Sequence, residues 1–351
     1  MVGGDRMDNK KVVVGLSGGV DSSVAAYLLK EQGYEVIGVN LNVWQGEQSD
    51  AKAVADHLGI EYHVYDYQEE FKREVVSYFI EEYMAGRTPN PCNMCNRRIK
   101  WSCLLKAAED FGAEYIATGH YARIDKLEGD RYAICNSVTA TKDQTYALCN
   151  LTQEQLSKTI MPIGSYEKSR IREIAESINL PVASKADSQD ICFIPDGDYA
   201  SFIREMGNIN IESGQFVDKT GKVLGTHKGI TDYTIGQRKG LNLAMGHPVF
   251  VVDIDPEHNQ VVIGESEDLF TTRVIAKDFN YMAVAKMEPG DEFVGKIRYA
   301  HKGTKCKVIK QYEDKVEIEF EEPVRAITPG QNLVLYKGEY VAGGGIIVRD
   351  K

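Results

Sequence analysis

Short runs of β-branched residues alternate with helix-periodic segments through the first third of the chain. The run over residues 12–16 ends in a glycine-rich stretch, and an apolar-periodic segment over residues 22–32 follows and stops before Gly33. This order predicts a buried strand, a loop and a helix. The pattern repeats, with strands expected over residues 35–40, 61–65 and 115–118 and helices over residues 50–58, 69–84 and 97–111. Such β–α–β units predict a parallel sheet that binds ligands at the carboxyl ends of its strands.

The pattern changes to short strands and glycine turns from about Gly214 onward. Val316, Ile318 and Phe320 alternate with three glutamates, which is typical of a half-buried antiparallel strand with its glutamates in solvent. Other strands are expected over residues 261–263, 305–309, 333–336 and 346–348. We therefore predict a disordered leader (1–10), an α/β domain with a parallel sheet (11–205), a small linking domain (206–270) and a C-terminal β-barrel (271–351).

Composition limits the environment in which this fold works. Hydrophobic residues make up 43% and charged residues 26% of 351 positions, as in a soluble globular protein, and no apolar run approaches the roughly 20 residues that a membrane span needs. No secretion signal is visible, and seven cysteines, an odd number, favour a reducing compartment, so we expect a cytoplasmic enzyme with no membrane partner. The net charge of −11 argues against a generally basic nucleic-acid coat but allows a local basic stripe.

The loop after the first strand is the strongest chemical signal. Residues 15–22 are Gly-Leu-Ser-Gly-Gly-Val-Asp-Ser, and the two adjacent glycines let a ligand approach the backbone closely at a helix N-terminus, which favours anions. The Lys-Ser/Thr pair of a Walker A loop is missing. The loop instead resembles the Ser-Gly-Gly-x-Asp-Ser loop of the ATP pyrophosphatases, which split ATP between its α- and β-phosphates. Asp21 is suited to hold Mg²⁺ on those phosphates.

A pair of cysteines occurs in the segment over residues 86–96. Its two prolines are expected to keep this segment extended up to a helix that follows it. Cys92 and Cys95 would then lie at a helix start beside Arg97 and Arg98, where a thiol is expected to have a lowered pKa. The C-x-x-C spacing by itself fits a redox pair or half of a metal site.

Cys192 and His120 are the other candidate site residues. Cys192 has apolar neighbours and by itself would be a buried small hydrophobe, but beside the nucleotide loop and a first cysteine site it becomes a candidate sulfur carrier. His120 follows Gly119 at the end of an expected strand, which favours a site role over a packing role. The remaining cysteines are expected to be packing residues, namely Cys103, Cys135, Cys149 and Cys306.

Together these motifs resemble the tRNA-specific 2-thiouridylase family of the ATP pyrophosphatases. The resemblance runs from about Lys10 to the end of the chain. It rests on residues 15–22, Gly-Arg-Thr-Pro-Asn-Pro at 86–91, Cys-Asn at 95–96, Ala-Thr-Gly-His-Tyr at 117–121, Lys-Asp-Gln at 142–144, Asp-x-x-x-Ile-Cys-Phe-Ile at 187–194, Thr-Ile-Gly-Gln-Arg-Lys-Gly-Leu at 234–241, Ile-Arg-Tyr at 297–299 and Pro-Gly-Gln at 329–331.

The resemblance implies an ATP-dependent tRNA-uridine 2-sulfurtransferase. ATP adenylates the C2 oxygen of the wobble uridine of tRNA, a persulfide on Cys192 delivers sulfur to C2, AMP leaves, and Cys95 is the second catalytic thiol. The ATP-binding positions are Gly15, Leu16, Ser17, Gly18, Gly19, Val20, Asp21, Ser22, Leu41 and Gly119. The positions that contact the target base or tRNA are Asn90, Pro91, Cys92, His120, Lys142, Asp143, Gln144, Arg298, Tyr299 and Gln331. The implied partners are tRNA and a sulfur source, either a cysteine desulfurase, a relay protein or sulfide.

Cys92 departs from the commonest family pattern, which has Asp at this place. Cys92, Cys95 and Cys192 would be three thiols at one site, and with one open position they could hold an iron–sulfur cluster whose free iron binds sulfide. Alternatively, Cys92 lines the base pocket and forms a disulfide with Cys95 on oxidation. The persulfide and cluster routes both stay open at this point.

Two other functions are weighed against this reading. One is an ATP pyrophosphatase that ligates or amidates a small metabolite, which the C-terminal β region and the cysteines argue against. The other is an RNA-binding protein with a vestigial nucleotide fold, which the intact loop argues against. Binding of tRNA by an acidic protein requires a local basic stripe, for which the candidates are Arg97, Arg98, Lys100, Arg170, Arg172, Lys185, Lys228, Arg238, Lys239, Arg298, His301, Lys302, Lys305 and Lys307.

Overall fold

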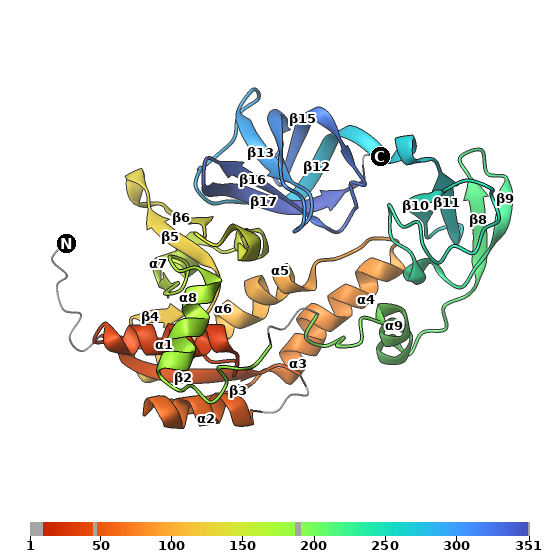
Figure 1. The fold of residues 1–351 in the computed structure, drawn as a ribbon. Helices are drawn as coiled ribbons and strands as arrows, with labels where there is room; N and C mark the ends of the chain where they lie inside the picture. Colours follow the sequence, from red (N-terminus) through yellow and green to blue (C-terminus); the bar gives the residue numbers. More distant parts are fainter. Residues whose placement is uncertain (1–9, 45–47, 187–190, 350–351) are drawn as a thin grey trace. The chain divides into compact units, whose positions relative to one another are not determined.

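The computed structural model describes residues 10–44, 48–186 and 191–349 (Figure 1). The expected leader therefore lies outside the described residues, apart from Lys10. The chain forms two compact units. The first comprises residues 1–74, 92–193 and 338–342, and the second comprises residues 75–91, 194–337 and 343–351.

A five-stranded sheet forms the centre of the first unit, in the order β3-β2-β1-β4-β7. Every neighbouring pair is parallel, which confirms the predicted parallel sheet. The strands are β1 (Lys11–Gly15), β2 (Glu35–Asn42), β3 (Glu61–Asp66), β4 (Tyr115–Ala117) and β7 (Thr159–Ile160). Because β1 is flanked by strands on both sides, its three valines are completely buried, as a continuous β-branched run predicts.

Helices cover this sheet and add most of the buried apolar surface. Val24, Ala25 and Leu29 of α1 pack in one cluster with Val12 and Val14 of β1. The helices of this unit are α1 (Val20–Glu31), α2 (Ser49–Leu58), α3 (Gln68–Phe71), α5 (Pro91–Cys95), α6 (Trp101–Phe111), α7 (Gln153–Ser157) and α8 (Lys168–Ser177), with short turns η3 (Glu128–Asp130), η4 (Ala140–Lys142) and η5 (Thr145–Leu148). A hairpin of β5 (Ala122–Lys126) and β6 (Tyr132–Asn136) follows β4, and Tyr340 pairs with Cys135 of β6.

The segment around the cysteine pair differs from the sequence prediction. Helix starts at Pro91, so that α5, a π-helical turn η2 (Asn96–Lys100) and α6 follow one another without a break. A proline at the first helical position costs nothing, because its missing N–H would have no partner within the helix anyway. The expected helix over residues 69–84 is likewise present as α3, a π-helical turn η1 (Lys72–Val76) and α4 (Ser77–Met84).

The second unit contains two β structures, in agreement with the predicted linking domain and barrel. A four-stranded sheet has the order β10-β11-β8-β9, and six strands form a barrel in the order β12-β15-β14-β13-β16-β17, closed by pairing of β12 with β17. The strands are β8 (Gly214–Asp218), β9 (Val223–His227), β10 (Phe250–Asp255), β11 (Gln260–Gly264), β12 (Phe270–Tyr281), β13 (Glu292–Lys296), β14 (Thr304–Gln311), β15 (Lys315–Arg325), β16 (Asn332–Lys337) and β17 (Tyr340–Val348), with α9 (Tyr199–Gly207), η6 (Ile230–Asp232) and η7 (Ser266–Leu269).

One glutamate of β15 breaks the predicted alternation of buried and exposed positions. Glu317 is only 4% exposed, although the pattern predicts that it faces solvent. Its carboxylate pairs with the guanidinium of Arg273 on β12 and lies 3.4 Å from the hydroxyl of Tyr312. The buried charge is therefore compensated across the strand pair, which a pattern within one strand does not reveal.

Candidate active site

The glycine-rich loop joins the end of β1 to the start of α1. The Leu16 amide donates to the Val39 carbonyl at 2.8 Å, and the Asn40 side-chain amide donates to the Leu16 carbonyl at 2.9 Å. The Ser17 amide donates to the Ser22 hydroxyl at 3.2 Å, which closes the loop on the first turn of the helix. The loop thus has a fixed shape before any ligand binds, and the N-terminus of α1 supplies donors for an anion.

Two glycines lie where a side chain would collide with this loop. Gly18 has a φ of +73°, and a Cβ at this position would come within 2.9 Å of the Ala51 amide nitrogen. A Cβ on Gly119 would come within 2.5 Å of the Ser22 amide nitrogen. The chain after β4 therefore packs directly on the start of α1, and β2, which ends just after Leu41, pairs with the other side of β1. The ATP-binding positions that the resemblance implies all belong to this edge of the sheet.

Asp21 at the start of α1 is held by two side chains to which the sequence analysis assigned no role. The Tyr121 hydroxyl donates to one carboxylate oxygen at 2.7 Å, and the Lys168 ammonium lies 2.8 and 3.0 Å from the two oxygens. The carboxylate is a suitable ligand for Mg²⁺ beside phosphates, but in this structure both of its oxygens are engaged. Tyr121 was in view as part of the motif over residues 117–121, whereas nothing in the sequence singled out Lys168.

A second lysine contacts the loop from another segment. The Lys185 ammonium lies 2.6 Å from an Asp50 carboxylate oxygen and 3.3 Å from the Gly18 carbonyl oxygen. The sequence analysis listed Lys185 as a candidate for a tRNA-binding stripe. In the structure its ammonium lies beside the nucleotide loop. Arg172, another member of that list, donates to the Ala183 and Lys185 carbonyls and so holds this segment in place.

The three candidate thiols lie in one region of the first unit. Cys92 and Cys192 are exposed and Cys95 is partly exposed. Although part of this residue reaches the surface, neighbouring atoms desolvate its thiol, and this desolvation together with charge repulsion from the nearby thiols of Cys95 and Cys92 raises the pKa of Cys192 to about 11. Cys192 therefore lies close enough to the C-x-x-C pair for the charges of these thiols to interact.

The prediction of a lowered thiol pKa at the helix start is wrong. Burial raises the pKa of both Cys92 and Cys95, which outweighs the opposing effect of the nearby Lys100 ammonium. Arg98, which was expected to lower these values, instead forms an ion pair with Glu74 at 2.9 Å. The thiols are therefore protonated at neutral pH, and any nucleophilic step requires loss of their protons.

His120 lies next to Lys100 and is uncharged. Burial lowers the pKa of this imidazole well below 6.5, and repulsion from the Lys100 ammonium lowers it further. One ring nitrogen lies 2.8 Å from the Thr118 hydroxyl and the other 3.5 Å from the Lys100 ammonium nitrogen. A neutral ring that accepts from Lys100 must carry its proton on Nδ1 and donate it to Thr118.

An aromatic cluster fixes the residue that follows Cys192. The Phe193 ring is 3% exposed, and its centroid lies 5.9 Å from the Trp44 ring and 5.5 Å from the Phe71 ring. Trp44 and Phe71 are 6.1 Å apart, so all three rings contact one another in arrangements that aromatic pairs prefer. The neighbouring motif residues 187–190 lie outside the described part of the chain.

Asp143 and Gln144, which the resemblance implies contact tRNA, form hydrogen bonds to loops of the protein itself in this structure. Both oxygens of Asp143 accept hydrogen bonds, one from the Ser137 amide at 2.8 Å and the other from the Thr145 amide at 3.1 Å. The Gln144 side-chain carbonyl accepts from the Tyr121 amide at 2.8 Å. Lys142, directly before them, is partly exposed.

In the second unit, Gln331 binds the segment that precedes the cysteine helix. Its side-chain amide donates to the Thr88 carbonyl at 3.0 Å and to the Pro89 carbonyl at 3.3 Å. The Thr88 amide donates in turn to the Pro329 carbonyl at 2.9 Å, and a Cβ on Gly330 would come within 2.9 Å of the Thr88 oxygen. Two separate motifs of the sequence are thus parts of one packed structure, which ends at Asn90 and Pro91.

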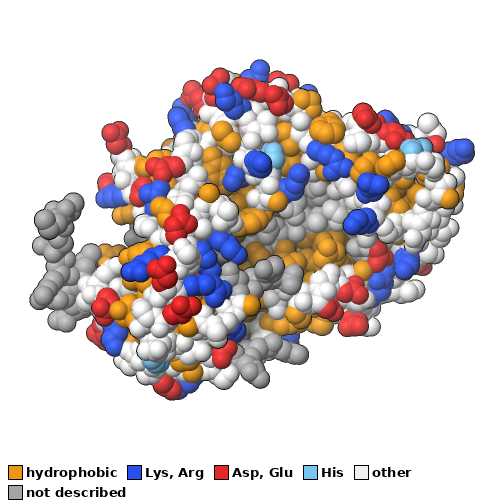
Figure 2. Space-filling view, in the orientation of Figure 1, with side chains coloured by type: hydrophobic (Ala, Val, Ile, Leu, Met, Phe, Trp, Pro, Cys, Tyr) orange, Lys and Arg blue, Asp and Glu red, His pale blue; other side chains and the backbone are white. Residues whose placement is uncertain are grey.

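The same unit exposes basic and aromatic side chains. Tyr299 is 51% exposed, beside Arg298, whose guanidinium donates to the Arg325 carbonyl at 3.0 Å. Figure 2 shows Lys and Arg side chains beside hydrophobic ones over the C-terminal strands. The exposed basic residues of the expected stripe in this unit are Lys228, Arg238, Lys239, Lys302, Lys305 and Lys307.

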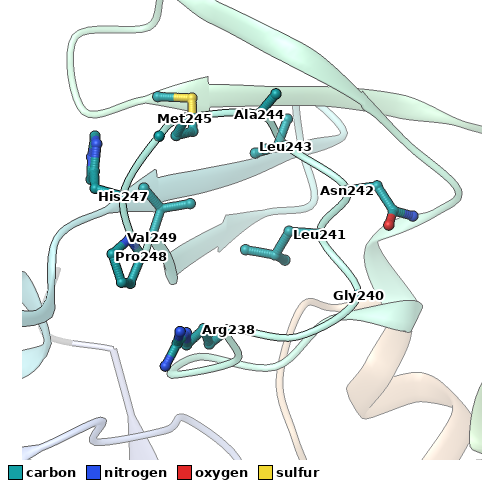
Figure 3. A pocket seen from close by; sticks show the side chains of 11 residues that line it. Arg238, Gly240, Leu241, Asn242, Leu243, Ala244, Met245, His247, Pro248 and Val249 are labelled. Atoms are coloured by element: carbon teal, nitrogen blue, oxygen red, sulfur yellow. The ribbon is translucent and has the colours of Figure 1, made fainter.

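Arg238 also borders a cavity of about 490 Å³ within the second unit. The cavity is open to solvent and is lined by the loop from Arg238 to Val249, and Leu241 points into it (Figure 3). His247 on its rim is paired with Glu265 at 2.9 Å. The cavity contains none of the residues of the nucleotide loop or of the three candidate thiols.

The structure bears on the two alternatives weighed for Cys92. All seven cysteines are free thiols, so Cys92 and Cys95 form no disulfide in this structure, and both residues lie on one short helix. Within the described residues, no three Cys, His, Asp or Glu side chains are placed to hold a metal ion. The three thiols therefore do not fit an iron–sulfur cluster as they stand. Among the described residues, no helix combines the length and apolarity of a membrane span.

Comparison with known proteins gives a consistent assignment over the whole chain. Profiles described as the tRNA methyl transferase HUP domain, the tRNA methyl transferase PRC-barrel domain and the aminomethyltransferase beta-barrel domain match residues 10–196, 201–265 and 271–347. A complex of a 4-thiouridine synthetase with RNA and bound ATP resembles the chain with a TM-score of 0.38, at 18% identity over 56% of this chain and 50% of that one, which is too distant to support an argument.

Full-length relatives are much closer. The tRNA-specific 2-thiouridylase MnmA of Lachnoclostridium phytofermentans is 54% identical over 356 residues, covering 97% of this chain and 100% of that protein. The protein of the same name from Clostridioides difficile is 50% identical over 354 residues, covering 97% and 98%. With the parallel sheet, the two β structures and the motif residues in place, this similarity shows that the chain belongs to the tRNA-specific 2-thiouridylase family.

Proposed function

We propose that this tRNA-specific 2-thiouridylase uses ATP to adenylate the C2 oxygen of the wobble uridine of tRNA and then replaces that oxygen with sulfur, releasing AMP and pyrophosphate. The observation that carries the proposal is the pre-shaped loop at the N-terminus of α1 in the same unit as three thiols. A carbonyl oxygen is a poor leaving group, and adenylation turns it into a good one. The loop offers amide donors to the pyrophosphate that departs.

ATP would bind across the edge formed by residues 15–22, Leu41 and Gly119. Asp21 would hold the Mg²⁺ that accompanies the phosphates, once its present partners release it. The metal would neutralise phosphate charge, while the chain itself positions the nucleotide through the amides of α1. A base within an anticodon loop must be splayed out to reach this edge, as in other RNA-modifying sites.

Sulfur would travel on Cys192. The terminal sulfur of a Cys192 persulfide attacks C2, and the bond between C2 and the adenylated oxygen breaks, so that AMP leaves with its electron pair. Attack of the Cys95 thiolate on the Cys192 sulfur then releases 2-thiouridine and leaves a disulfide between the two cysteines. An external thiol reduces that disulfide, and a persulfide-carrying donor, a desulfurase or a relay protein, passes its terminal sulfur to the Cys192 thiolate and leaves with a free thiol of its own. If the donor is sulfide, it would instead attack the Cys192 sulfur of the disulfide, which forms the Cys192 persulfide and releases the Cys95 thiolate.

The other site residues that the resemblance implies are proposed on the same basis. Asn90, Pro91, Cys92, His120 and Lys142 would face the target base or its neighbours, while Asp143 and Gln144 would act by shaping the loop that presents them. Arg298 and Tyr299 would contact tRNA from the barrel. We also propose the domain division 11–205, 206–270 and 271–351 and a cytoplasmic location.

A single assay tests this function. Purified protein is incubated with ATP, a persulfide donor and unmodified tRNA, and AMP and thiolated nucleoside are measured by mass spectrometry. We expect AMP and 2-thiouridine to form in equal amounts, and only with tRNA. Formation of AMP with a small amine acceptor in the absence of tRNA would contradict the proposal and favour a metabolite ligase or amidase.

A further inference from the structure

One ammonium group acts on all three candidate thiols, although the reaction described so far gives it no role. Lys100 is the last residue of the π-helical turn η2, and the sequence analysis listed it only as a candidate for a tRNA-binding stripe. Its positive charge opposes the desolvation that raises the pKa of Cys92, of Cys95 and of Cys192. Lys100 therefore lies close enough to the three thiols for its charge to act on each of them.

An uncharged histidine holds the Lys100 side chain in place. Nε2 of His120 lies 3.5 Å from the ammonium nitrogen, and Nδ1 lies 2.8 Å from the Thr118 hydroxyl. The imidazole packs on the Trp101 ring, with centroids 5.6 Å apart, and the Trp101 indole donates to the Thr159 hydroxyl at 2.9 Å. Because burial lowers the pKa of His120 well below 6.5, the imidazole orients the ammonium without adding a charge of its own.

Two other cations of the same continuous helix are paired with carboxylates. Arg98 forms an ion pair with Glu74 at 2.9 Å, and Lys106 forms one with Asp110 at 2.6 Å. Among the residues that the structure describes, no carboxylate lies within ion-pair distance of the Lys100 ammonium. Its charge is therefore left to the neighbouring sulfur atoms. A nearby cation favours the ionised form of a thiol, and this form is the nucleophile in sulfur chemistry.

We propose that the Lys100 ammonium stabilises the thiolates of the sulfur-transfer site, above all the Cys95 thiolate that attacks Cys192. The Cys95 thiol gives its proton to water, and its sulfur forms a bond to the Cys192 sulfur. The bond between Cys192 and the transferred sulfur breaks, and its electron pair stays with 2-thiouridine. Lys100 keeps its own proton throughout and acts by its charge. The inference rests on the proposed sulfur transfer and adds a residue to it.

The test measures how fast iodoacetamide alkylates Cys95 and Cys192 at about pH 8 in the full chain, without ATP or tRNA, by peptide mass spectrometry. Iodoacetamide is uncharged, so loss of a cation does not change its attraction to the site. Lys100→Gln is compared with Lys100→Arg, which keeps the charge. Lys106→Gln is the matched control, because it removes a lysine of the same continuous helix whose ammonium is paired with Asp110. Thermal unfolding checks that each variant is folded, and Lys100→Met replaces Lys100→Gln if that variant unfolds.

We expect Lys100→Gln to slow alkylation of both thiols about tenfold, the lower end of the effect that an opposite charge has on a neighbouring ionisable group. Lys100→Arg and Lys106→Gln should react at the natural rate. Unchanged alkylation in Lys100→Gln, or equal slowing in Lys106→Gln, would overturn the proposal.

A second measurement connects the thiolates to the reaction. In a single-turnover assay, Lys100→Gln should form 2-thiouridine about tenfold more slowly near pH 7 and should recover most of the natural rate near pH 9, where the thiols ionise more readily. Natural 2-thiouridine formation by a Lys100→Gln chain with slow alkylation would overturn the role of Lys100 in sulfur transfer. A natural chain that forms no 2-thiouridine, but whose alkylation responds to Lys100, would overturn the proposed function alone.

Discussion

Replacement of Gly119 by alanine tests whether the chain after β4 is pressed against the nucleotide loop. The added Cβ would lie 2.5 Å from the Ser22 nitrogen and 2.7 Å from the Asp21 carbonyl carbon, about 0.9 Å closer than the 3.4 Å at which ordinary contact begins. Both neighbours are backbone atoms, so no flexible side chain can move aside. Overpacking of this kind costs about 1–3 kcal/mol, which lowers the unfolding temperature by roughly 2–12 °C for a unit of this size.

The same displacement moves the amide donors at the start of α1. Losing one of them as a phosphate contact should weaken ATP binding about tenfold or more, measured by calorimetry beside the thermal unfolding. Gly19→Ala is the matched control, because its Cβ would meet its nearest neighbour, the Ser17 hydroxyl, at an ordinary 3.5 Å. It should unfold at the natural temperature. An unchanged unfolding temperature and ATP affinity for Gly119→Ala would refute the argument from close packing.

Four further outcomes are expected. Cys95→Ala and Cys192→Ala should each abolish 2-thiouridine formation, measured by nucleoside mass spectrometry. The natural protein should stay fully active when metal analysis shows that it contains no iron, and activity that rises with iron content would contradict the persulfide route. Since its pKa is about 11, the Cys192 thiol should be alkylated by iodoacetamide about tenfold faster for each pH unit between pH 7 and 10. The alkylation rate is followed by peptide mass spectrometry, and a rate that already stops rising near pH 7 would contradict this pKa. Because the Phe193 ring anchors the Cys192 segment, Phe193→Ala should slow sulfur transfer at least several-fold without changing ATP affinity, and Phe193→Leu should have an intermediate rate. Equal single-turnover rates for the natural chain and both variants would exclude this role. Arg298→Ala should weaken tRNA binding and make it less dependent on salt concentration, without changing ATP affinity. A tRNA affinity of the natural chain that does not change with salt in filter-binding assays would contradict a phosphate contact.

Local patterns predicted the nucleotide loop well, because its geometry is determined by neighbouring residues. The buried valines of β1, the glycine with positive φ and the helix that follows are all consequences of a short stretch of chain. The pattern could not reveal Lys168 as a partner of Asp21, since the two meet only when α8 packs beside α1. Prediction of the helix start failed for a different reason. A proline both breaks and begins helices, and only the structure shows which of these Pro91 does.

The thiol pKa prediction shows a similar limit. Proximity in sequence suggested that Arg98 would stabilise thiolates, but its guanidinium is paired with Glu74, which lies 24 residues earlier and belongs to another helical segment. Glu317 provides the reverse case, because alternation predicted an exposed carboxylate that Arg273 instead allows to be buried. Charged side chains have long reach, so their partners are decided by tertiary packing more than by their position in an element.

The packing of Thr88 against Pro329, Gly330 and Gln331 has a consequence for synthesis of the protein. The two sides of this contact are 243 residues apart in the chain, so it cannot form while a ribosome is still making the barrel. The nucleotide loop and its sheet, by contrast, are complete much earlier in translation and can begin to fold as a domain. Closing so long a chain loop is a slow, late event in folding. A nascent chain can therefore acquire its nucleotide site well before the segment leading into the cysteine helix is fixed, and truncation before Pro329 should leave that segment unanchored.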